Sequence, residues 1–148
     1  MNLSIREVPD RFSRAIVLIR LLVGAVFLSE GIQKFLFSGT LGVVRFVKIG
    51  IPLPEFSAPF VGAVEIAGGA LILLGLFTRF AALPLVINML VAISTTKIPI
   101  LLEKGFWVMA HESRTDWSML LGSIFLVLVG GGVWSVDAWL SKRSAEQR

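Results

Sequence analysis

Four apolar segments, each close to the roughly 20 residues that a membrane-spanning helix needs, limit what this chain can fold into more than any other feature. They cover residues 14–37, 57–77, 80–102 and 117–136. At 1.5 Å per residue, each segment is long enough to cross a hydrocarbon layer about 30 Å thick. Only 16% of the residues are charged, so the chain lacks the polar surface of a soluble domain. The sequence therefore predicts an all-α integral membrane protein.

The connections between these segments predict an up-down four-helix bundle that forms one domain over residues 1–148. The second and third segments meet in a tight turn around Thr78 and Arg79, whereas longer loops follow the first and third segments. Short and long connections of this kind join the antiparallel helices of a bundle. Pro84 falls in the first turns of its segment, where proline is tolerated, and Pro99 is expected to end or bend the same helix.

The distribution of basic residues predicts that both termini lie in the cytoplasm. Lys and Arg are enriched in cytoplasmic connections, and the larger of two basic groups lies at the end that includes both termini. This predicts a multi-pass protein of the cell inner (plasma) membrane. A cleaved signal peptide is the less favoured interpretation of the first segment, because Arg20 interrupts its apolar core. The larger group contains Arg6, Arg11, Arg14, Arg79, Lys142, Arg143 and Arg148, and the smaller contains Arg45, Lys48, Lys97, Lys104 and Arg114.

Several chemistries are excluded by residues that the chain lacks. There is no cysteine, which excludes thiol relays, cysteine-bound zinc and iron–sulfur clusters. The single histidine, His111, lies in a polar loop, so we predict no metal site. The net charge of +4 does not indicate nucleic-acid binding, because the basic residues lie near segment ends instead of forming one patch. Basic flanks of this kind suit lipid headgroups, and the lipid bilayer is the expected partner.

Charged residues inside the first segment indicate a functional or structural site. Helical spacing of about 100° per residue places Arg20, Glu30 and Lys34 on one side, together with Gly24 and Gly31. A charge that faces lipid costs roughly 2.5 to 3.5 kcal/mol, so this side should face other helices. Two structural interpretations stay open: Arg20 pairs with the backbone, or Glu30 and Lys34 form an ordinary i,i+4 ion pair.

The second and third segments add polar residues that should face the same interior. Glu65 lies about two turns inside its segment among glycines that allow close helix packing, and Asn88 shares a face with small residues. Asp116 immediately precedes the fourth segment. We therefore predict a polar pocket that opens toward the outer face, with Glu65 as a hydrogen-bonding or proton-exchanging group. The candidate binding residues are Glu65, Glu30, Lys34, Arg20, Asn88 and Asp116.

Two stretches of sequence resemble the DoxX family of four-helix bacterial membrane proteins. They are GAVFLSEGIQKF, residues 24–35, and EIAGGALILLGLFTRFAALPLVINMLVA, residues 65–92. The ending GGGVWSVDAWL, residues 130–140, is similar to the glycine-rich closing motif of many members. Glu30 departs from the pattern, since many members carry a small residue or histidine there. The member that gives the family its name is similar to a subunit of a thiosulfate–quinone oxidoreductase, others are linked to redox-stress complexes, and distant relatives act as assembly chaperones.

The resemblance implies a membrane subunit of a redox system, an oxidoreductase component that receives electrons from a partner protein and interacts with quinone. A non-catalytic assembly factor or interaction scaffold is the alternative, in which buried charges only fix helix register. A small transporter is the least favoured function, because four helices are few unless the chain forms a homo-oligomer, and no inverted repeat is visible.

Overall fold

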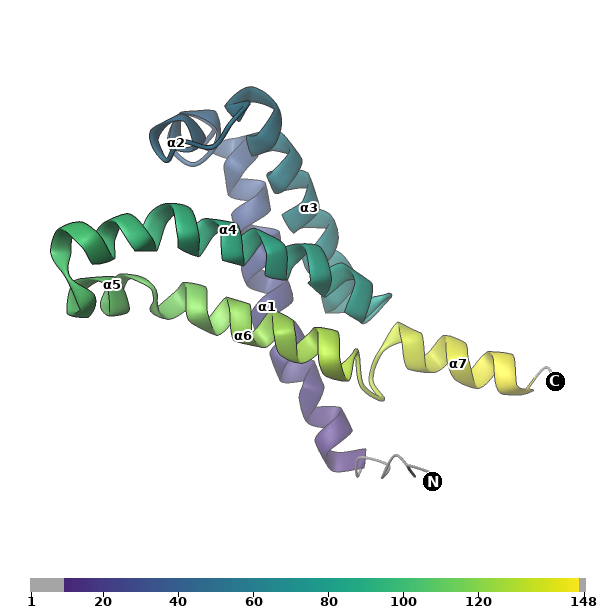
Figure 1. The fold of residues 1–148 in the computed structure, drawn as a ribbon. Helices are drawn as coiled ribbons and strands as arrows, with labels where there is room; N and C mark the ends of the chain where they lie inside the picture. Colours follow the sequence, from purple (N-terminus) through teal and green to yellow (C-terminus); the bar gives the residue numbers. More distant parts are fainter. Residues whose placement is uncertain (1–9, 147–148) are drawn as a thin grey trace, which may run out of the picture.

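The computed structural model describes residues 10–146, with side chains from Phe12 onward, and every regular element in that part of the chain is a helix. This confirms the predicted all-α class. Figure 1 shows the helices in space. In chain order they are α1 (Asp10–Leu36), α2 (Val43–Lys48), α3 (Pro54–Leu74), α4 (Thr78–Lys104), α5 (Phe106–Glu112), α6 (Arg114–Val129) and α7 (Val136–Glu146).

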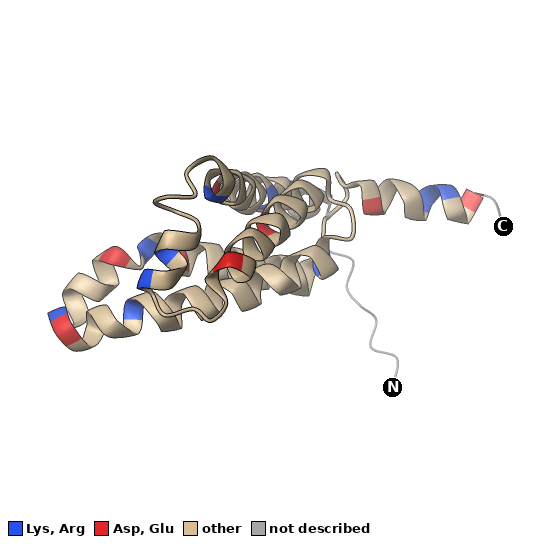
Figure 2. Cartoon of the chain, turned by 90° about the horizontal axis from the view of Figure 1, so that it is seen from above, with Lys and Arg blue, Asp and Glu red and all other residues tan. Residues whose placement is uncertain are grey.

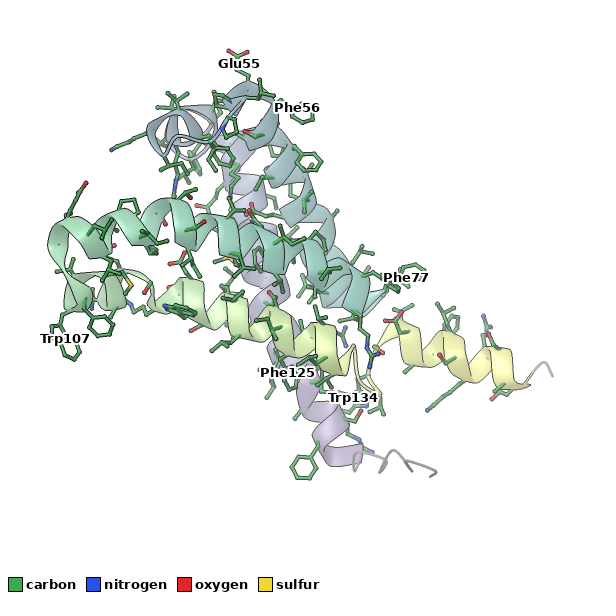
Figure 3. All side chains as sticks on the ribbon, viewed as in Figure 1. Glu55, Phe56, Phe77, Trp107, Phe125 and Trp134 are labelled. Atoms are coloured by element: carbon green, nitrogen blue, oxygen red, sulfur yellow. The ribbon has the colours of Figure 1, made fainter. Side chains whose placement is uncertain are left out.

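Three of these helices are long and apolar enough to cross a membrane, namely α1, α3 and α4. Many of their large apolar side chains are exposed, and Figure 3 shows Phe56 and Phe77 pointing away from the neighbouring helices. Exposed apolar area on this scale fits a protein whose solvent is hydrocarbon. The chain is therefore built as a membrane protein, as its composition predicts.

The predicted fourth span, residues 117–136, is wrong in its extent. The helix α6 has 16 residues and ends at Val129. Gly130 follows with φ of 86° and Gly132 has φ of 74°, a left-handed backbone that glycine adopts easily and that stops a helix. The residues after this break form the separate helix α7, which the sequence analysis did not predict.

Other helix boundaries differ from the predicted ones, because local sequence signals such as proline do not alone decide where a helix begins or ends. Proline is tolerated in the first turn of a helix, so α3 begins at Pro54, three residues before the predicted start. Pro99 does not end α4, which continues to Lys104. The polar loop predicted after the third segment contains the helix α5, and His111 lies in its last turn.

Paired glycines bring α1 and α3 into backbone contact along much of their length. Gly24 faces Gly69, and Gly31 faces Gly62, so the same seven-residue spacing on both helices matches them in antiparallel order. A Cβ atom at Gly69 would lie 2.6 Å from the backbone nitrogen of Leu28 and 2.8 Å from the carbonyl oxygen of Gly24. Only glycine fits at such a contact, as expected for small residues at membrane helix interfaces.

The helices α4 and α6 form a second pair, which runs across the α1–α3 pair (Figure 1). The tight turn at 75–77 joins the two pairs, with Gly75 in a left-handed conformation. Fully buried apolar side chains from all four helices, including Val23, Ile72, Leu85 and Leu126, fill the crossing. Away from the turn the pairs diverge, and α2 packs against α3 on that side.

We expect Gly69→Ala to destabilise the protein by about 1–3 kcal/mol, because the added methyl group meets backbone atoms that cannot rotate away. Gly39→Ala is the control, since a Cβ at Gly39 meets nothing within 4 Å. Thermal unfolding of both variants in the same detergent measures the difference. Equal melting temperatures would contradict the close α1–α3 contact.

Candidate functional site

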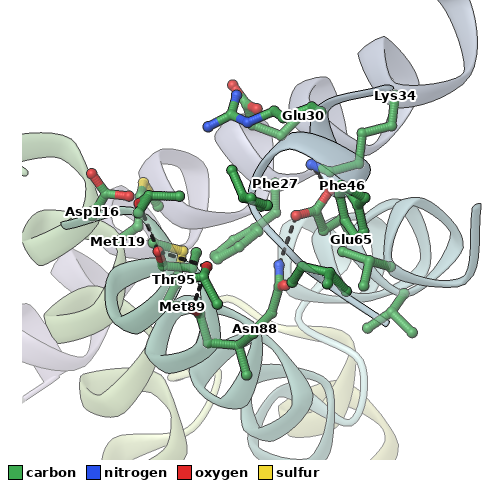
Figure 4. A pocket seen from close by; sticks show the side chains of 18 of the residues that line it. Phe27, Glu30, Lys34, Phe46, Glu65, Asn88, Met89, Thr95, Asp116 and Met119 are labelled. Atoms are coloured by element: carbon green, nitrogen blue, oxygen red, sulfur yellow. Dashed lines mark hydrogen bonds and ion pairs between the residues drawn. The ribbon is translucent and has the colours of Figure 1, made fainter. Parts of the chain in front are cut away.

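A cavity of about 580 Å³ lies where the two helix pairs diverge (Figure 4). Its walls come from α1, α2, α3, α4 and α6, and most of the lining is apolar, with Phe27, Phe46, Phe60 and Met119 among the side chains. Five of the six predicted binding residues line it. They are Glu30, Lys34, Glu65, Asn88 and Asp116.

Glu65 is the most buried charged group of the cavity, with 4% of its surface exposed. Lys34 Nζ lies 2.6 Å from Glu65 Oε2, and Asn88 Nδ2 donates to Glu65 Oε1 at 2.7 Å. Because these three residues belong to α1, α3 and α4, one carboxylate connects three helices. Charge-assisted hydrogen bonds of this kind are stronger than neutral ones, and they replace the water that the burial of Glu65 removes.

Lys34 forms its ion pair with Glu65 and not with Glu30, which excludes the interpretation of an ordinary i,i+4 pair on α1. Glu30 lines the same cavity with an exposed side chain. The carboxylates of Glu30 and Glu65 therefore border one space, Glu30 with an exposed side chain and Glu65 with a buried one.

A second ion pair lies in the wall made by α4 and α6. Lys97 Nζ is 3.2 Å from Asp116 Oδ2, and it also donates to the carbonyl oxygen of Glu112 at 3.1 Å. Asp116 was a predicted pocket residue, whereas Lys97 was predicted only as a member of the smaller basic group. Helical spacing gave no signal for it, because nine residues separate Lys97 from Asn88 and place it on the opposite side of an ideal helix.

Arg45 and Phe46 were also missed. Both belong to the short helix α2 and line the cavity. They lie in a connection that the sequence analysis treated as a loop, and no local pattern shows that this connection folds back over the helix pairs.

Arg20 does not line the cavity, so its prediction as a pocket residue is corrected by the structure. It is 3% exposed and donates to the carbonyl oxygens of Ile72, Leu73, Gly131 and Trp134. Ten residues separate Arg20 from Glu30, which is about 15 Å along a helix, so Arg20 reaches the end of α3 instead. The carbonyl groups there have no intrahelical donor, and a cation at a helix C-terminus is favourable. The interpretation of Arg20 as a backbone partner is the one that the structure supports.

Asp137 closes the same end and was not predicted. Its carboxylate accepts from the backbone nitrogens of Phe77 at 2.8 Å and Thr78 at 3.1 Å, and from the Thr78 hydroxyl at 3.3 Å. It therefore caps the N-terminus of α4 from a position 59 residues further along the chain than Thr78. The glycine-rich stretch 130–132 lets Thr78 approach this loop, since a Cβ at Gly131 would lie 2.7 Å from Thr78 Oγ1.

Residues 15–98 match the model of the DoxX family, and this match covers Lys34, Glu65 and Asn88. The chain belongs to the DoxX family. The resemblance predicted from the sequence is thus confirmed.

Two DoxX-like relatives are similar over most of the chain. "Uncharacterized membrane protein Rv3486" of Mycobacterium tuberculosis is 55% identical over 136 residues, which cover 88% of this chain and 83% of that protein. "Putative oxidoreductase CatD" of Bacillus subtilis is 31% identical over 131 residues, which cover 88% of this chain and 90% of that protein. No solved structure matches the chain.

The donor set of this DoxX cavity suits an uncharged polar ligand better than a metal ion. Within residues 10–146, no group of three or more His, Cys, Asp or Glu side chains lies close enough together to hold a metal. The charges lining the cavity are Glu30, Glu65 and Asp116 against Lys34, Arg45 and Lys97, so they cancel. An apolar space with a few hydrogen-bonding groups is the usual form of a small-molecule site.

We expect Lys34→Met to lower the free energy of unfolding by about 3–5 kcal/mol, because it leaves the buried Glu65 carboxylate without its cation. A second substitution, Glu65→Leu, should recover part of this loss, since the double variant buries no unpaired charge. Denaturant titration in mixed micelles measures the two values.

Lys48→Met is the control, because Lys48 is exposed and lies outside the cavity lining. If Lys34→Met and Lys48→Met destabilise the protein equally, the Lys34–Glu65 pair does not stabilise the helix arrangement.

Proposed function

We propose that this DoxX protein is a membrane subunit of a redox system and that its cavity binds a quinone. The observation that carries the proposal is the buried carboxylate of Glu65, held between Lys34 and Asn88 at the wall of a mainly apolar cavity. A quinone combines an apolar ring and tail with two carbonyl oxygens, and this cavity offers apolar walls with a few polar groups.

The residues of the cavity have the chemistry that such a ligand needs. Lys34 and Asn88 carry N–H groups that donate to a carbonyl oxygen. Glu65 is a carboxyl group that can hold or release a proton, and Glu30 provides a second carboxyl group at the same cavity. A quinone would supply two-electron, two-proton chemistry. The chain has no cysteine for a redox relay, so the electrons come from a partner protein.

The relative from Bacillus subtilis supports a redox role, because its name describes an oxidoreductase and it matches 88% of this chain. Fold and family alone do not fix an activity, so this support is additional to the cavity.

A second candidate function is a non-catalytic scaffold or assembly factor. The observation that favours it is that both ion pairs, Lys34–Glu65 and Lys97–Asp116, connect different helices, which is also what a purely structural role requires. The two candidates differ in what the cavity binds.

We further propose that the protein lies in the cell inner membrane as an up-down bundle, with α6 as its fourth span. In this arrangement both termini lie in the cytoplasm. The described basic residues support this arrangement, since Arg14, Arg79, Lys142 and Arg143 lie on elements around the loop 130–135, whereas Arg45 and Lys97 line the cavity. Figure 2 shows charged residues at both ends of the molecule. Arg6 and Arg148, and the side chain of Arg11, lie outside the described residues.

Quinone binding is tested with the full chain purified in detergent. We expect organic extraction to release quinone and a short-chain quinone to raise the melting temperature. Asn88→Leu should weaken binding roughly tenfold, because one hydrogen bond lost in an apolar pocket is worth about 1–3 kcal/mol.

Ser94→Ala is the matched control, since it removes a polar group from the same helix at an exposed position outside the cavity lining. Absence of extracted quinone together with an unchanged melting temperature would exclude the quinone proposal and favour the scaffold.

Topology is tested by single cysteines, which the cysteine-free chain allows without background. A membrane-impermeant maleimide added to intact cells should label Thr40→Cys and His111→Cys, which lie in connections at the cavity end. Ser144→Cys on α7 should react only after permeabilisation. Labelling of His111→Cys and Ser144→Cys from the same side would show that α6 does not cross the membrane.

A further inference from the structure

The helix α7, the loop before it and the adjacent ends of α1 and α4 carry basic residues that neither the cavity nor the proposed redox role uses. We name this region the basic end and define it as Arg14, Arg79, Lys142, Arg143, Trp134 and Trp139. It lies at the opposite end of the helix assembly from the cavity, beside the turn 75–77, because Asp137 at the start of α7 bonds to Phe77 and Thr78. In Figure 1, α7 extends away from the other helices.

Two arginines of the basic end lie over tryptophan rings. Arg14 is 5.8 Å from the ring centroid of Trp134, and Arg143 is 4.4 Å from that of Trp139. Both indoles are exposed, at 61% and 52% of their surface. Tryptophan prefers the boundary between hydrocarbon and headgroups. When an arginine stacks on an aromatic ring, the flat face of the guanidinium contacts the ring. The N–H groups at the edge of the guanidinium then stay free to donate to a phosphate.

Arg79 provides a third cation beside a hollow of about 350 Å³ that Gly130, Gly131 and Ser135 also line. Gly130 makes room for it, since a Cβ there would lie 3.2 Å from Arg79 Nε. Arg79 has a single long hydrogen bond within the described residues, at 3.4 Å to the carbonyl oxygen of Val129. Most of its donor capacity is therefore available to a ligand.

Two acidic groups share this end with the four cations, and Asp137 lines the same hollow as Arg79. Both oxygens of Asp137 accept hydrogen bonds from the start of α4, and Glu146 lies in the last turn of α7. Four cations and two exposed indoles therefore lie on α7, on the loop before it and on the adjacent ends of α1 and α4.

From this arrangement we infer that the basic end binds the phosphate of an anionic phospholipid, with the two tryptophans at the level of the headgroup. Charge complementarity favours a phosphate, and the exposed indoles favour a lipid over a free anion. Clusters of four or more Lys and Arg beside a membrane span are typical of anionic-lipid recognition.

The test uses the full chain purified in detergent and titrated with phosphatidylglycerol, with phosphatidylcholine of the same acyl chains as the neutral comparison. Native mass spectrometry counts the bound lipids. We expect tighter binding of phosphatidylglycerol, and about fivefold weaker binding for each charge removed in the double variant Lys142→Gln, Arg143→Gln. This variant should fold normally, because α7 extends away from the other helices (Figure 1), and thermal unfolding without added lipid checks it.

The control is Lys48→Gln, Lys104→Gln, which removes two exposed charges outside the basic end. Three results would each overturn the inference: equal affinity for the two lipids, equal weakening by the two double variants, or displacement of the lipid by millimolar inorganic phosphate. None of these results depends on whether the cavity binds a quinone.

Discussion

A polar group inside the hydrocarbon layer has to find its partner within the protein, and this requirement organises the structure. Glu65 meets it with Lys34 from α1 and Asn88 from α4, so a single carboxylate holds three helices at one level. Lys97 and Asp116 do the same for α4 and α6. Lipid tails are as apolar as leucine side chains, so apolar contacts alone select neighbours weakly. The polar contacts select which helices meet.

The two ends of the helix assembly use their charged residues differently. Near the 75–77 turn, Arg20 and Asp137 bond to backbone groups that helix ends leave free, so these side chains serve the fold. In the cavity, Lys34 and Asn88 each donate to the Glu65 carboxylate at the cavity wall. Arg20 lies outside the lining of both hollows described above, whereas the Glu65 carboxylate borders the larger one. Burial alone does not distinguish them, since Arg20 and Glu65 are equally hidden.

Sequence reasoning predicted the spans α1, α3 and α4, because long apolar runs with few charges are typical of membrane-spanning helices. It also placed Glu65 and Asn88 in one pocket, since both lie on small, polar helix faces. It failed for Arg20, because the direction of the side chain around the helix was given more weight than its distance of about 15 Å along the helix from Glu30. It failed for Lys97 and Asp137, whose partners depend on how distant helices pack. The sequence shows the glycines at 130–132. Whether the helix ends at Gly130 depends on their φ angles, which the sequence does not give.

The glycine contacts between α1 and α3 have a mechanical consequence. Gly24 against Gly69 and Gly31 against Gly62 seat backbone on backbone at two points, so neither helix can slide or roll without a collision. The glycine contacts make these two helices one rigid pair. The cavity lies between the α1–α3 pair and the α4–α6 pair, and the short turn at 75–77 joins the two pairs. The glycine contacts therefore fix the α1 and α3 walls of the cavity relative to each other, whereas α2, α4 and α6 provide the other walls.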